Sequence, residues 1–535
     1  MTGPVLAVDQ GTSGTKALVV CPERGVLGTG FADVTPRHLP GGLVEVDPAE
    51  LYASVVDAGH RALAEAGEDV VAMGLANQGE TVLAWDPTTG RPLTDALVWQ
   101  DRRAETVCAE LADHAEELRQ LTGLPLDPYF AAPKMAWIRR HLTREGVVTT
   151  SDAWLVHRLT GAFVTDAATA GRTQLLDLDR AQWSPRALEA YGLSDERLPE
   201  VVDNAQPVGA TSVFGPEIPL TGLAVDQQAA LLAQRITGPG AAKCTYGTGA
   251  FLLAHTGSAP RRGTSGLVSC VAWRLAGDTG YCLDGQVYTA ASAVRWLTDL
   301  GVISSAADLD PVGGAVPDSG GVTFVPALAG LAAPWWRGDL RGSITGLGLD
   351  TGPGHLVRAL CEGLAAQVVE LAEAAAADLG TPLGPPAKVP PAPRRPARTL
   401  AAPGASPSTS STRAYTRHAE STHRTPRGPA FGRTTGPSQQ ALDALRVDGG
   451  LTRSALLMQT QADLLQRPVE VSALHDATAL GAATLARLGA DPTLSVEDAL
   501  PDWKPATVYE PRIPADQAAE RLAGFRSAVA ALLDS

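Results

Sequence analysis

The pattern of apolar and polar positions divides the chain into two kinds of segment that alternate. Short apolar runs of strand length occur at residues 5–10, 16–21, 70–76, 220–226 and 445–450. Between them lie longer Ala- and Leu-rich stretches, notably at 49–67 and 355–380. The second of these repeats apolar residues at i, i+3, i+4 and i+7, which is the spacing of one helix face. Strands that alternate with helices predict an α/β protein built of layered sheets.

Residues 384–440 interrupt this pattern. They contain eleven prolines among 57 residues, nine Lys or Arg and one acid, so this segment carries about +8 and the rest of the chain about −23. Without apolar periodicity it cannot bury enough surface to offset its ordering entropy, and we expect a disordered basic insertion. Two alternatives are open. A reading frame shifted out of register in a GC-rich gene would give the same mixture, and a basic segment can tether RNA or membrane.

Length and composition are typical of a soluble metabolic enzyme. At 535 residues the chain has room for two or more domains. The net charge of −15 argues against general binding of nucleic acid. The N-terminus lacks a basic region followed by a long apolar run, and no segment reaches eighteen uninterrupted apolar residues, so we expect a cytoplasmic protein without membrane insertion. Its six cysteines are scattered without metal-ligand spacing and are expected to be reduced.

Two short segments combine apolar strands with a turn rich in Gly, Thr and Ser. They are VLAVDQGTSGTKALVVC at 5–21 and AKCTYGTGAFLLAH at 242–255. Glycine lets the backbone approach an anion closely, and amides with hydroxyls supply donors. Either segment alone can be an ordinary hairpin turn, but two copies about a domain length apart predict hairpins that grip the phosphates of one nucleotide. A third glycine-rich segment, RVDGGLTRS at 446–454, ends a strand and opens a helix, where a phosphate or adenosine can bind.

These segments belong to a longer ordered series of motifs. The series is AVDQGTSGTKA, NQGET, VWQDRR, TGLPLDPYF with PKMAW after it, GLAVDQQAALL, TYGTGAF, GLAAPWW, GSITGL, and RVDGG followed by LLMQTQADLL. In this order they resemble the carbohydrate kinase family of glycerol, xylulose and gluconate kinases, with the glycerol kinase branch nearest. The resemblance covers nearly all of the chain except the insertion. It implies two ribonuclease-H-like domains, of the actin and hexokinase type, around an ATP cleft, and we place them at 1–236 and 237–535.

Particular residues carry the chemistry that the resemblance implies. Asp226 ends an apolar strand before a helical run, where a carboxylate can point into a cleft, and the family's catalytic base matches this position. Asp9 would hold Mg²⁺ through water, with Asp226 as the second metal-binding carboxylate. The candidates for ATP binding are Thr12, Ser13, Gly14, Thr15, Lys16, Gly247, Thr248, Gly249, Ala291, Arg295, Gly449, Gly450 and Ser454. Of these, Ser454, Arg295 and Ala291 depart from the usual asparagine, glutamine and glycine, which leaves the adenine contacts open.

The substrate side departs from the glycerol kinase pattern at one position. The resemblance implies a polyol site with an aromatic floor and hydroxyl acceptors, made of Gln78, Glu80, Trp99, Tyr129, Asp226, Gln227 and Phe251. Gly79, inside NQGET, stands where arginine is usual. The pocket is therefore either a glycerol site completed by a different donor or a site for a longer polyol or sugar. A further interpretation is that Gly79 is a harmless turn residue and another arginine reaches into the pocket.

Three functions remain open at this point. The motif set favours ATP-dependent phosphorylation of glycerol to glycerol 3-phosphate, with Mg²⁺. Gly79 favours a kinase of a C4–C5 polyol or a ketose. The third is a non-catalytic nucleotide sensor of the actin-like fold, against which Asp226 and Glu80 count. A small-molecule polyol is the expected partner, and the sequence leaves a dimer or tetramer open.

Overall fold

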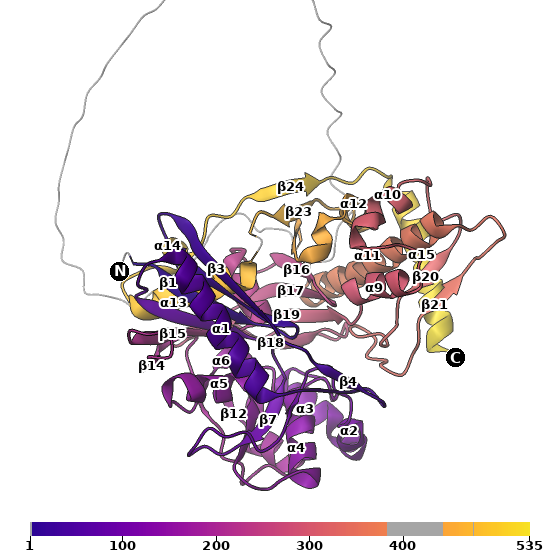
Figure 1. The fold of residues 1–535 in the computed structure, drawn as a ribbon. Helices are drawn as coiled ribbons and strands as arrows, with labels where there is room; N and C mark the ends of the chain where they lie inside the picture. The colour runs from indigo at the N-terminus through magenta and orange to yellow at the C-terminus, as the bar shows by residue number, and fades with distance from the viewer. Residues whose placement is uncertain (1–2, 382–441, 475, 535) are drawn as a thin grey trace, which may run out of the picture.

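The computed structural model describes residues 3–381, 442–474 and 476–534. The insertion predicted at 384–440 lies outside the described residues. The described chain forms two lobes, each built on a mixed β-sheet, with the indigo-to-magenta lobe formed mainly by the first half of the chain (Figure 1).

The first sheet has six strands in the order β14, β15, β6, β1, β2, β3. Their bounds are β14 Ala205–Thr211, β15 Ile218–Val225, β6 Ala72–Asn77, β1 Val5–Gln10, β2 Gly14–Cys21 and β3 Gly25–Asp33. Strands β1, β2 and β3 run antiparallel, whereas β6 and β15 run parallel to β1. Parallel strands have both faces covered, which explains why β6 is buried at every position.

The second sheet repeats this plan. Its order is β18, β19, β17, β16, β22, β23, β24. The bounds are β18 Val268–Leu275, β19 Asp278–Val287, β17 Ala250–Gly257, β16 Ala242–Tyr246, β22 Leu445–Asp448, β23 Val469–Ser472 and β24 Pro505–Tyr509. Strands β16, β17 and β19 are antiparallel, and β22 and β23 run parallel to β16, as β6 and β15 do to β1. Both predicted hairpins, β1–β2 and β16–β17, are therefore confirmed at equivalent places in the two sheets.

Two of the predicted helices are confirmed and cover the sheets. Helix α1 (Pro48–Ala66) begins where Asp47 accepts a hydrogen bond from the Ala49 amide and ends at Gly67 in the left-handed region. It packs on β2 and β3 of the first sheet. Helix α11 (Pro353–Asp378) forms much of the second core, together with α12 (Ala455–Leu465) and α15 (Ala515–Leu533).

Helix α13 (Ala477–Ala490) returns to the first lobe. It packs on β15, β6, β1 and α8 (Asp226–Ala233), although it lies far along the part of the sequence that we assigned to the second domain. At Gly74, in β6, a Cβ atom would lie 2.2 Å from the carbonyl oxygen of Ala482, so the helix backbone sits directly on the strand. Helix α13 thereby ties the end of the chain to the first sheet.

Smaller elements complete the first lobe. A five-stranded sheet has the order β4, β5, β8, β7, β9, with bounds β4 Arg37–Leu39, β5 Leu43–Val46, β8 Ala96–Leu97, β7 Val82–Trp85 and β9 Val147–Thr150. The helices that follow β8 in sequence are α2 Glu105–Glu110, α3 Ala115–Thr122, α4 Ala131–His141, α5 Ser151–Thr160, α6 Ala167–Ala170 and α7 Pro185–Tyr191. Short two-stranded pairs are formed by β10 Val164–Asp166 with β13 Glu200–Val202 and by β11 Leu176–Asp177 with β12 Gln182–Trp183.

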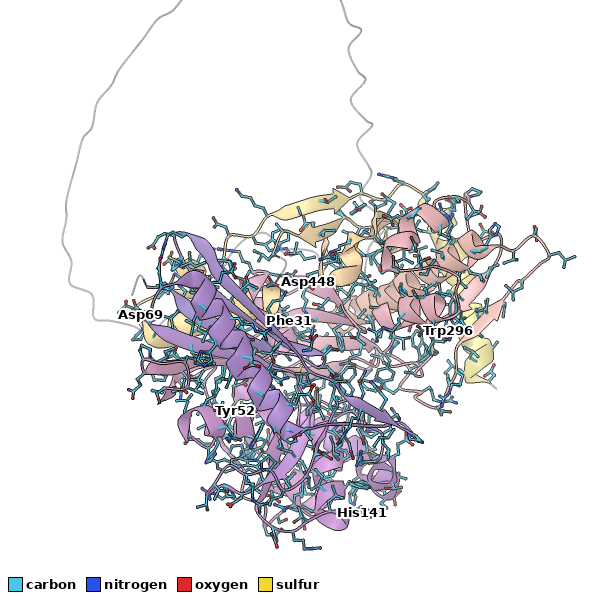
Figure 2. All side chains as sticks on the ribbon, in the orientation of Figure 1. Phe31, Tyr52, Asp69, His141, Trp296 and Asp448 are labelled. Atoms are coloured by element: carbon cyan, nitrogen blue, oxygen red, sulfur yellow. The ribbon has the colours of Figure 1, made fainter. Side chains whose placement is uncertain are left out.

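The second lobe adds α9 Ala291–Asp299, α10 Leu309–Gly313, α14 Val496–Ala499 and the pair β20 Thr323–Val325 with β21 Ser343–Thr345. A hydrogen bond of 2.8 Å from Gln234, after α8, to Asp448, at the end of β22, links the two halves (Asp448 is labelled in Figure 2). All six cysteines are free thiols, as predicted. Across the parts of the chain that the structure describes, no helix is long and apolar enough to cross a membrane.

Candidate active site

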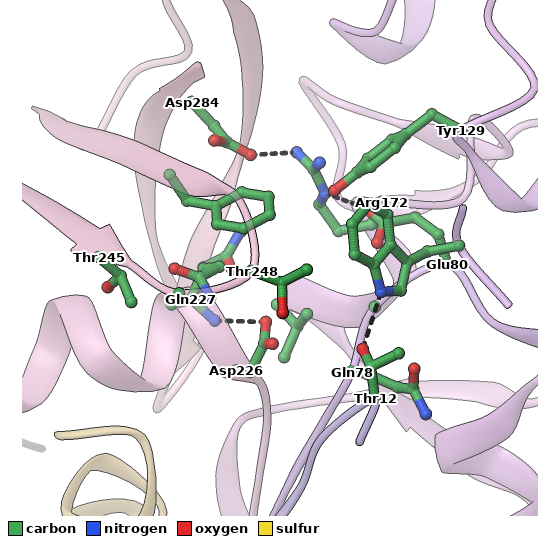
Figure 3. A pocket seen from close by; sticks show the side chains of 16 residues that line it. Thr12, Gln78, Glu80, Tyr129, Arg172, Asp226, Gln227, Thr245, Thr248 and Asp284 are labelled. Atoms are coloured by element: carbon green, nitrogen blue, oxygen red, sulfur yellow. Dashed lines mark hydrogen bonds and ion pairs between the residues drawn. The ribbon is translucent and has the colours of Figure 1, made fainter. Parts of the chain in front are cut away.

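A cavity of about 150 Å³ lies between the two lobes, where the turns of the two hairpins meet (Figure 3). It is lined by these residues that the sequence predicted for the site: Thr12, Gln78, Glu80, Trp99, Tyr129, Asp226, Gln227, Gly247, Thr248 and Phe251. The structure thus brings together all the predicted polyol-site residues and part of the predicted ATP site. The other lining residues are Gly79, Arg172, Val225, Gln228, Thr245 and Asp284.

Asp226 stands at the junction of β15 and α8. Its Oδ1 accepts a hydrogen bond of 2.7 Å from the backbone amide of Gln227, at the start of the helix. Burial raises the pKa of Asp226, and this hydrogen bond opposes the rise. The Asp226 carboxylate therefore lines the cavity, and its raised pKa makes it a stronger base than an ordinary carboxylate.

Asp9 lies in β1 directly opposite Lys16 of β2, so both side chains are on the same face of the sheet. Burial, the neighbouring charge of Asp226 and, to a smaller extent, Asp476 raise the pKa of Asp9, whereas Lys16 lowers it, and the net result is a pKa of about 7. Lys16 Nζ donates to Asp476 at 2.6 Å. The charges of Asp226, Asp476 and Lys16 are thus near enough to Asp9 to shift its pKa, and the two carboxylates oppose its ionisation.

Aromatic side chains form one wall of the cavity. The Trp99 ring contacts the rings of Tyr129 and Phe251 edge to face, with centroids 5.6 and 6.2 Å away. Trp99 Nε1 donates to Thr12 Oγ1 at 2.9 Å. Since the Thr12 oxygen accepts this bond, its own hydroxyl proton is free to be donated to a ligand in the cleft.

Gly79 has no side chain, but an arginine from another part of the chain lines the same cavity. Arg172, in the turn after α6, donates from Nε to Glu80 at 2.6 Å and from Nη1 to Asp284 at 2.7 Å (Figure 3). Burial raises the pKa of Glu80, and Arg172 opposes that rise. Glu80 has a φ of 58°, a strained conformation for a residue with a side chain, which the surrounding contacts must maintain. Of the interpretations of Gly79, the structure favours a turn residue beside another arginine.

Lys243 fixes the orientation of Gln227. Its Nζ is fully buried and donates to Gln227 Oε1 at 2.6 Å and to Thr245 Oγ1 at 2.8 Å. An ammonium group only donates, so the oxygen of the Gln227 amide must face Lys243. The Gln227 NH₂ group is left to donate to a hydroxyl or phosphate oxygen in the cavity.

The remaining candidates of the first hairpin do not line the cavity. Ser13 is exposed in the turn, and Gly14 opens β2. Thr15 is fully buried on the opposite face of β2 from Lys16, and its hydroxyl lies 2.6 Å from Ser54 Oγ in α1. The structure therefore does not support the prediction that the Thr15 hydroxyl donates to a phosphate, because strand alternation turns it into the core.

The candidates of the second lobe lie around the other hairpin. The Ala291 amide, at the start of α9, donates to the carbonyl oxygen of Gly247, while Arg295 is exposed on the same helix. Gly249 precedes β17. Gly449 has a φ of 94°, and a Cβ there would lie 2.4 Å from the Tyr246 carbonyl oxygen, so glycine is required; Gly450 follows it at the surface.

Ser454 is engaged within the protein. Its hydroxyl lies 2.5 Å from Asp310 Oδ1 and accepts a hydrogen bond from the Leu457 amide as the N-cap of α12. Its oxygen is thereby committed to capping the start of the helix, and any contact with adenine would have to replace one of these bonds.

Sequence reasoning missed Arg172, Asp284 and Lys243. Two of them had a usable signal, because Asp284 and Lys243 are charged residues within strands that are otherwise buried, β19 and β16. Arg172 had none, since GRT in a turn is an ordinary surface sequence.

Comparison with known proteins agrees with this geometry. The sequence matches the FGGY family of carbohydrate kinases, with its N-terminal domain at residues 4–233 and its C-terminal domain at 242–490. The chain belongs to this family. The family assignment, the two-domain α/β fold and the expectation of a kinase are thereby confirmed.

Among FGGY relatives, a glycerol kinase of Gloeobacter violaceus is 38% identical over 91% of this chain and 88% of its own length. A glycerol kinase of Aromatoleum aromaticum is 37% identical over 98% of both chains. Among solved FGGY structures, Plasmodium falciparum glycerol kinase with ADP has a TM-score of 0.80 and 28% identity, covering 99% of this chain and 98% of that one. A xylulose kinase of Rhodospirillum rubrum shares the fold, with a TM-score of 0.76, 22% identity and 99% of both chains covered.

Proposed function

We propose that this FGGY kinase transfers the γ-phosphoryl group of ATP to glycerol, giving glycerol 3-phosphate and ADP. The observation that carries the proposal is the placing of Asp226 in one small cavity with the Glu80–Arg172 pair and the turns of both hairpins. The relatives named as glycerol kinases, at 33–38% identity over nearly the whole chain, support the same substrate.

The chain's own groups have separate tasks in this reaction. Asp226 orients the attacking hydroxyl and accepts its proton. Glu80 accepts hydrogen bonds from other hydroxyls of the substrate, and Gln227 donates through the amide group that Lys243 orients. Trp99 and Phe251 cover the carbon chain and exclude water. The Thr12 and Thr248 hydroxyls and the turn amides donate to the phosphate oxygens.

Mg²⁺ fits the carboxylates below the first hairpin. The pKa of Asp9 is raised to about 7 by burial first and then by the negative charge of Asp226, and a divalent cation at this carboxylate would favour its charged form. The described residues contain no group of three or more metal-ligating side chains. One or two carboxylates with water molecules and phosphate oxygens are what Mg²⁺ normally takes, so Asp9 and Asp226 would hold it. Mg²⁺ bound there would supply positive charge that offsets the charge of the phosphates.

The alternative substrate, a C4–C5 polyol or ketose, depends on open space at Gly79. A Cβ atom at Gly79 would lie 3.0 Å from Val225 Cγ2, so part of the space beside this glycine is already filled. This favours glycerol.

A screen decides between the substrates. ADP release is measured with glycerol, with four- and five-carbon polyols and with ketoses, and the product is identified by NMR. A kcat/KM that is highest for glycerol supports the proposal, and a higher value for a longer substrate refutes it.

A further inference from the structure

Arg172 carries no role in the reaction described above. We propose that its guanidinium group binds a substrate hydroxyl directly and determines which polyols the site accepts. This inference rests on the proposed polyol kinase activity and identifies a specificity residue within it.

Arg172 is held rigidly where it meets the cavity. Its side chain is 3% exposed, and two carboxylates fix it, through Nε to Glu80 and through Nη1 to Asp284. The rings of Tyr129 and Phe130 lie 5.8 and 5.4 Å from its Cζ. A planar group fixed in this way loses little entropy when it makes one more hydrogen bond.

The same geometry leaves donor capacity unused. Arg172 lines the cavity, and among the described residues its Nη2 has no hydrogen-bond partner. It is also the only Lys or Arg among the described residues that line the cavity. A hydrogen bond donated to a substrate hydroxyl by a cationic side chain of the cavity lining therefore comes from Arg172.

Asp284 completes the arrangement. Its side chain is 4% exposed and Oδ2 pairs with Arg172, but Oδ1 has no hydrogen-bond partner in the described part of the chain. A buried carboxylate oxygen without a donor is costly. Because Oδ1 is also inaccessible to solvent, the part of this pair that can meet a substrate hydroxyl is Arg172 Nη2.

Val225 limits the space for a side chain at position 79. With Val225 Cγ2 only 3.0 Å from the Cβ that a side chain at Gly79 would have, a larger residue there needs Val225 to move. Gly79 and Val225 thus fit together as a pair, and the cation arrives from the turn after α6.

The test compares glycerol with its two deoxy analogues, 1,2-propanediol and 1,3-propanediol, each of which lacks one hydroxyl. We expect the wild-type protein to prefer glycerol over at least one analogue by about ten- to hundredfold in kcat/KM. Arg172→Gln should lower kcat/KM for glycerol by about that factor, mainly through KM, and leave the value for this analogue nearly unchanged. The preference then disappears because the hydroxyl that distinguishes the two substrates has lost its partner.

Two further variants keep the result interpretable. Arg180→Gln removes an arginine that is 78% exposed and lies a few residues further along the chain, and it should change nothing. If Arg172→Gln does not fold, as judged by thermal unfolding and ADP binding, Arg172→Lys is used. Lysine keeps the positive charge between the two carboxylates, but its single ammonium nitrogen replaces the three nitrogens of the guanidinium group. The preference for glycerol over the analogue should therefore also fall.

A folded Arg172 variant that retains the full wild-type preference for glycerol over both analogues overturns the inference. An equal loss of kcat/KM with all three substrates also overturns it, because such a loss indicates a purely structural role. Failure of the proposed function looks different. The wild-type protein would then phosphorylate a longer polyol better than glycerol, and the same comparison would be made with that polyol and its deoxy forms.

Discussion

Replacement of Asp226 by asparagine separates proton acceptance from binding. Asparagine has nearly the same shape, and its Oδ1 can keep the 2.7 Å hydrogen bond from the Gln227 amide that begins α8, so the helix should form normally. The amide cannot accept the hydroxyl proton. A positioned general base contributes about 10²–10⁴-fold, so we expect kcat to fall by at least about 10², or about 2.7 kcal/mol in the activation free energy.

The same substitution should not destabilise the protein. Asp226 is the charge that contributes most to the raised pKa of Asp9, after burial. A carboxyl group with a raised folded-state pKa costs stability as pH rises through its unfolded-state value, here from about pH 4 toward about 7. Removal of the Asp226 charge lowers the pKa of Asp9 and shrinks this loss, so the variant should be as stable as the wild type at pH 7, or more stable.

The assay is ADP release at saturating glycerol and ATP, with ADP binding by calorimetry and thermal unfolding at pH 5 and pH 7 as controls. A folded variant that binds ADP and turns over within about tenfold of the wild type would refute the assignment of Asp226 as the base. A loss of ADP binding would show that the residue acts on the nucleotide instead.

Three further predictions follow from single contacts. Trp99→Phe removes the hydrogen bond to Thr12 and part of the ring surface that covers the substrate, so KM should rise for both ATP and glycerol in steady-state kinetics, by about fivefold for ATP. His255 is buried and its pKa is lowered to about 4 from 6.5, so stability should fall by about 2 kcal/mol from pH 6.5 to 5 as the unfolded chain takes up the proton; His255→Phe should remove this loss in urea titrations. Gly30→Ala places a Cβ 1.9 Å from the Ala58 carbonyl oxygen of α1, and unfolding should show a loss of about 1–3 kcal/mol, whereas an unchanged midpoint would mean that the helix shifts freely.

The sequence alone was sufficient for the parts of the fold that depend on neighbours along the chain. Apolar runs separated by Gly, Thr and Ser predicted the hairpins β1–β2 and β16–β17, and the structure has both. The run that ends at Asp226 predicted a strand followed by a helix, and β15 and α8 meet there. These signals are local because strand alternation, helix periodicity and turn chemistry each act within a few residues.

Only the tertiary structure determined which side chains lie next to one another in the cleft. Arg172 meets Glu80 across 92 positions of sequence, and Asp284 joins them from the other sheet. The hydroxyl of Thr15, which the hairpin motif offered to a phosphate, is taken by Ser54 because the pleat of β2 points it into the core. Buried ion pairs and core hydrogen bonds of this kind leave no periodic trace in the sequence. They arise only when packing of the two sheets removes water from charged groups and each must find a partner from a distant part of the chain.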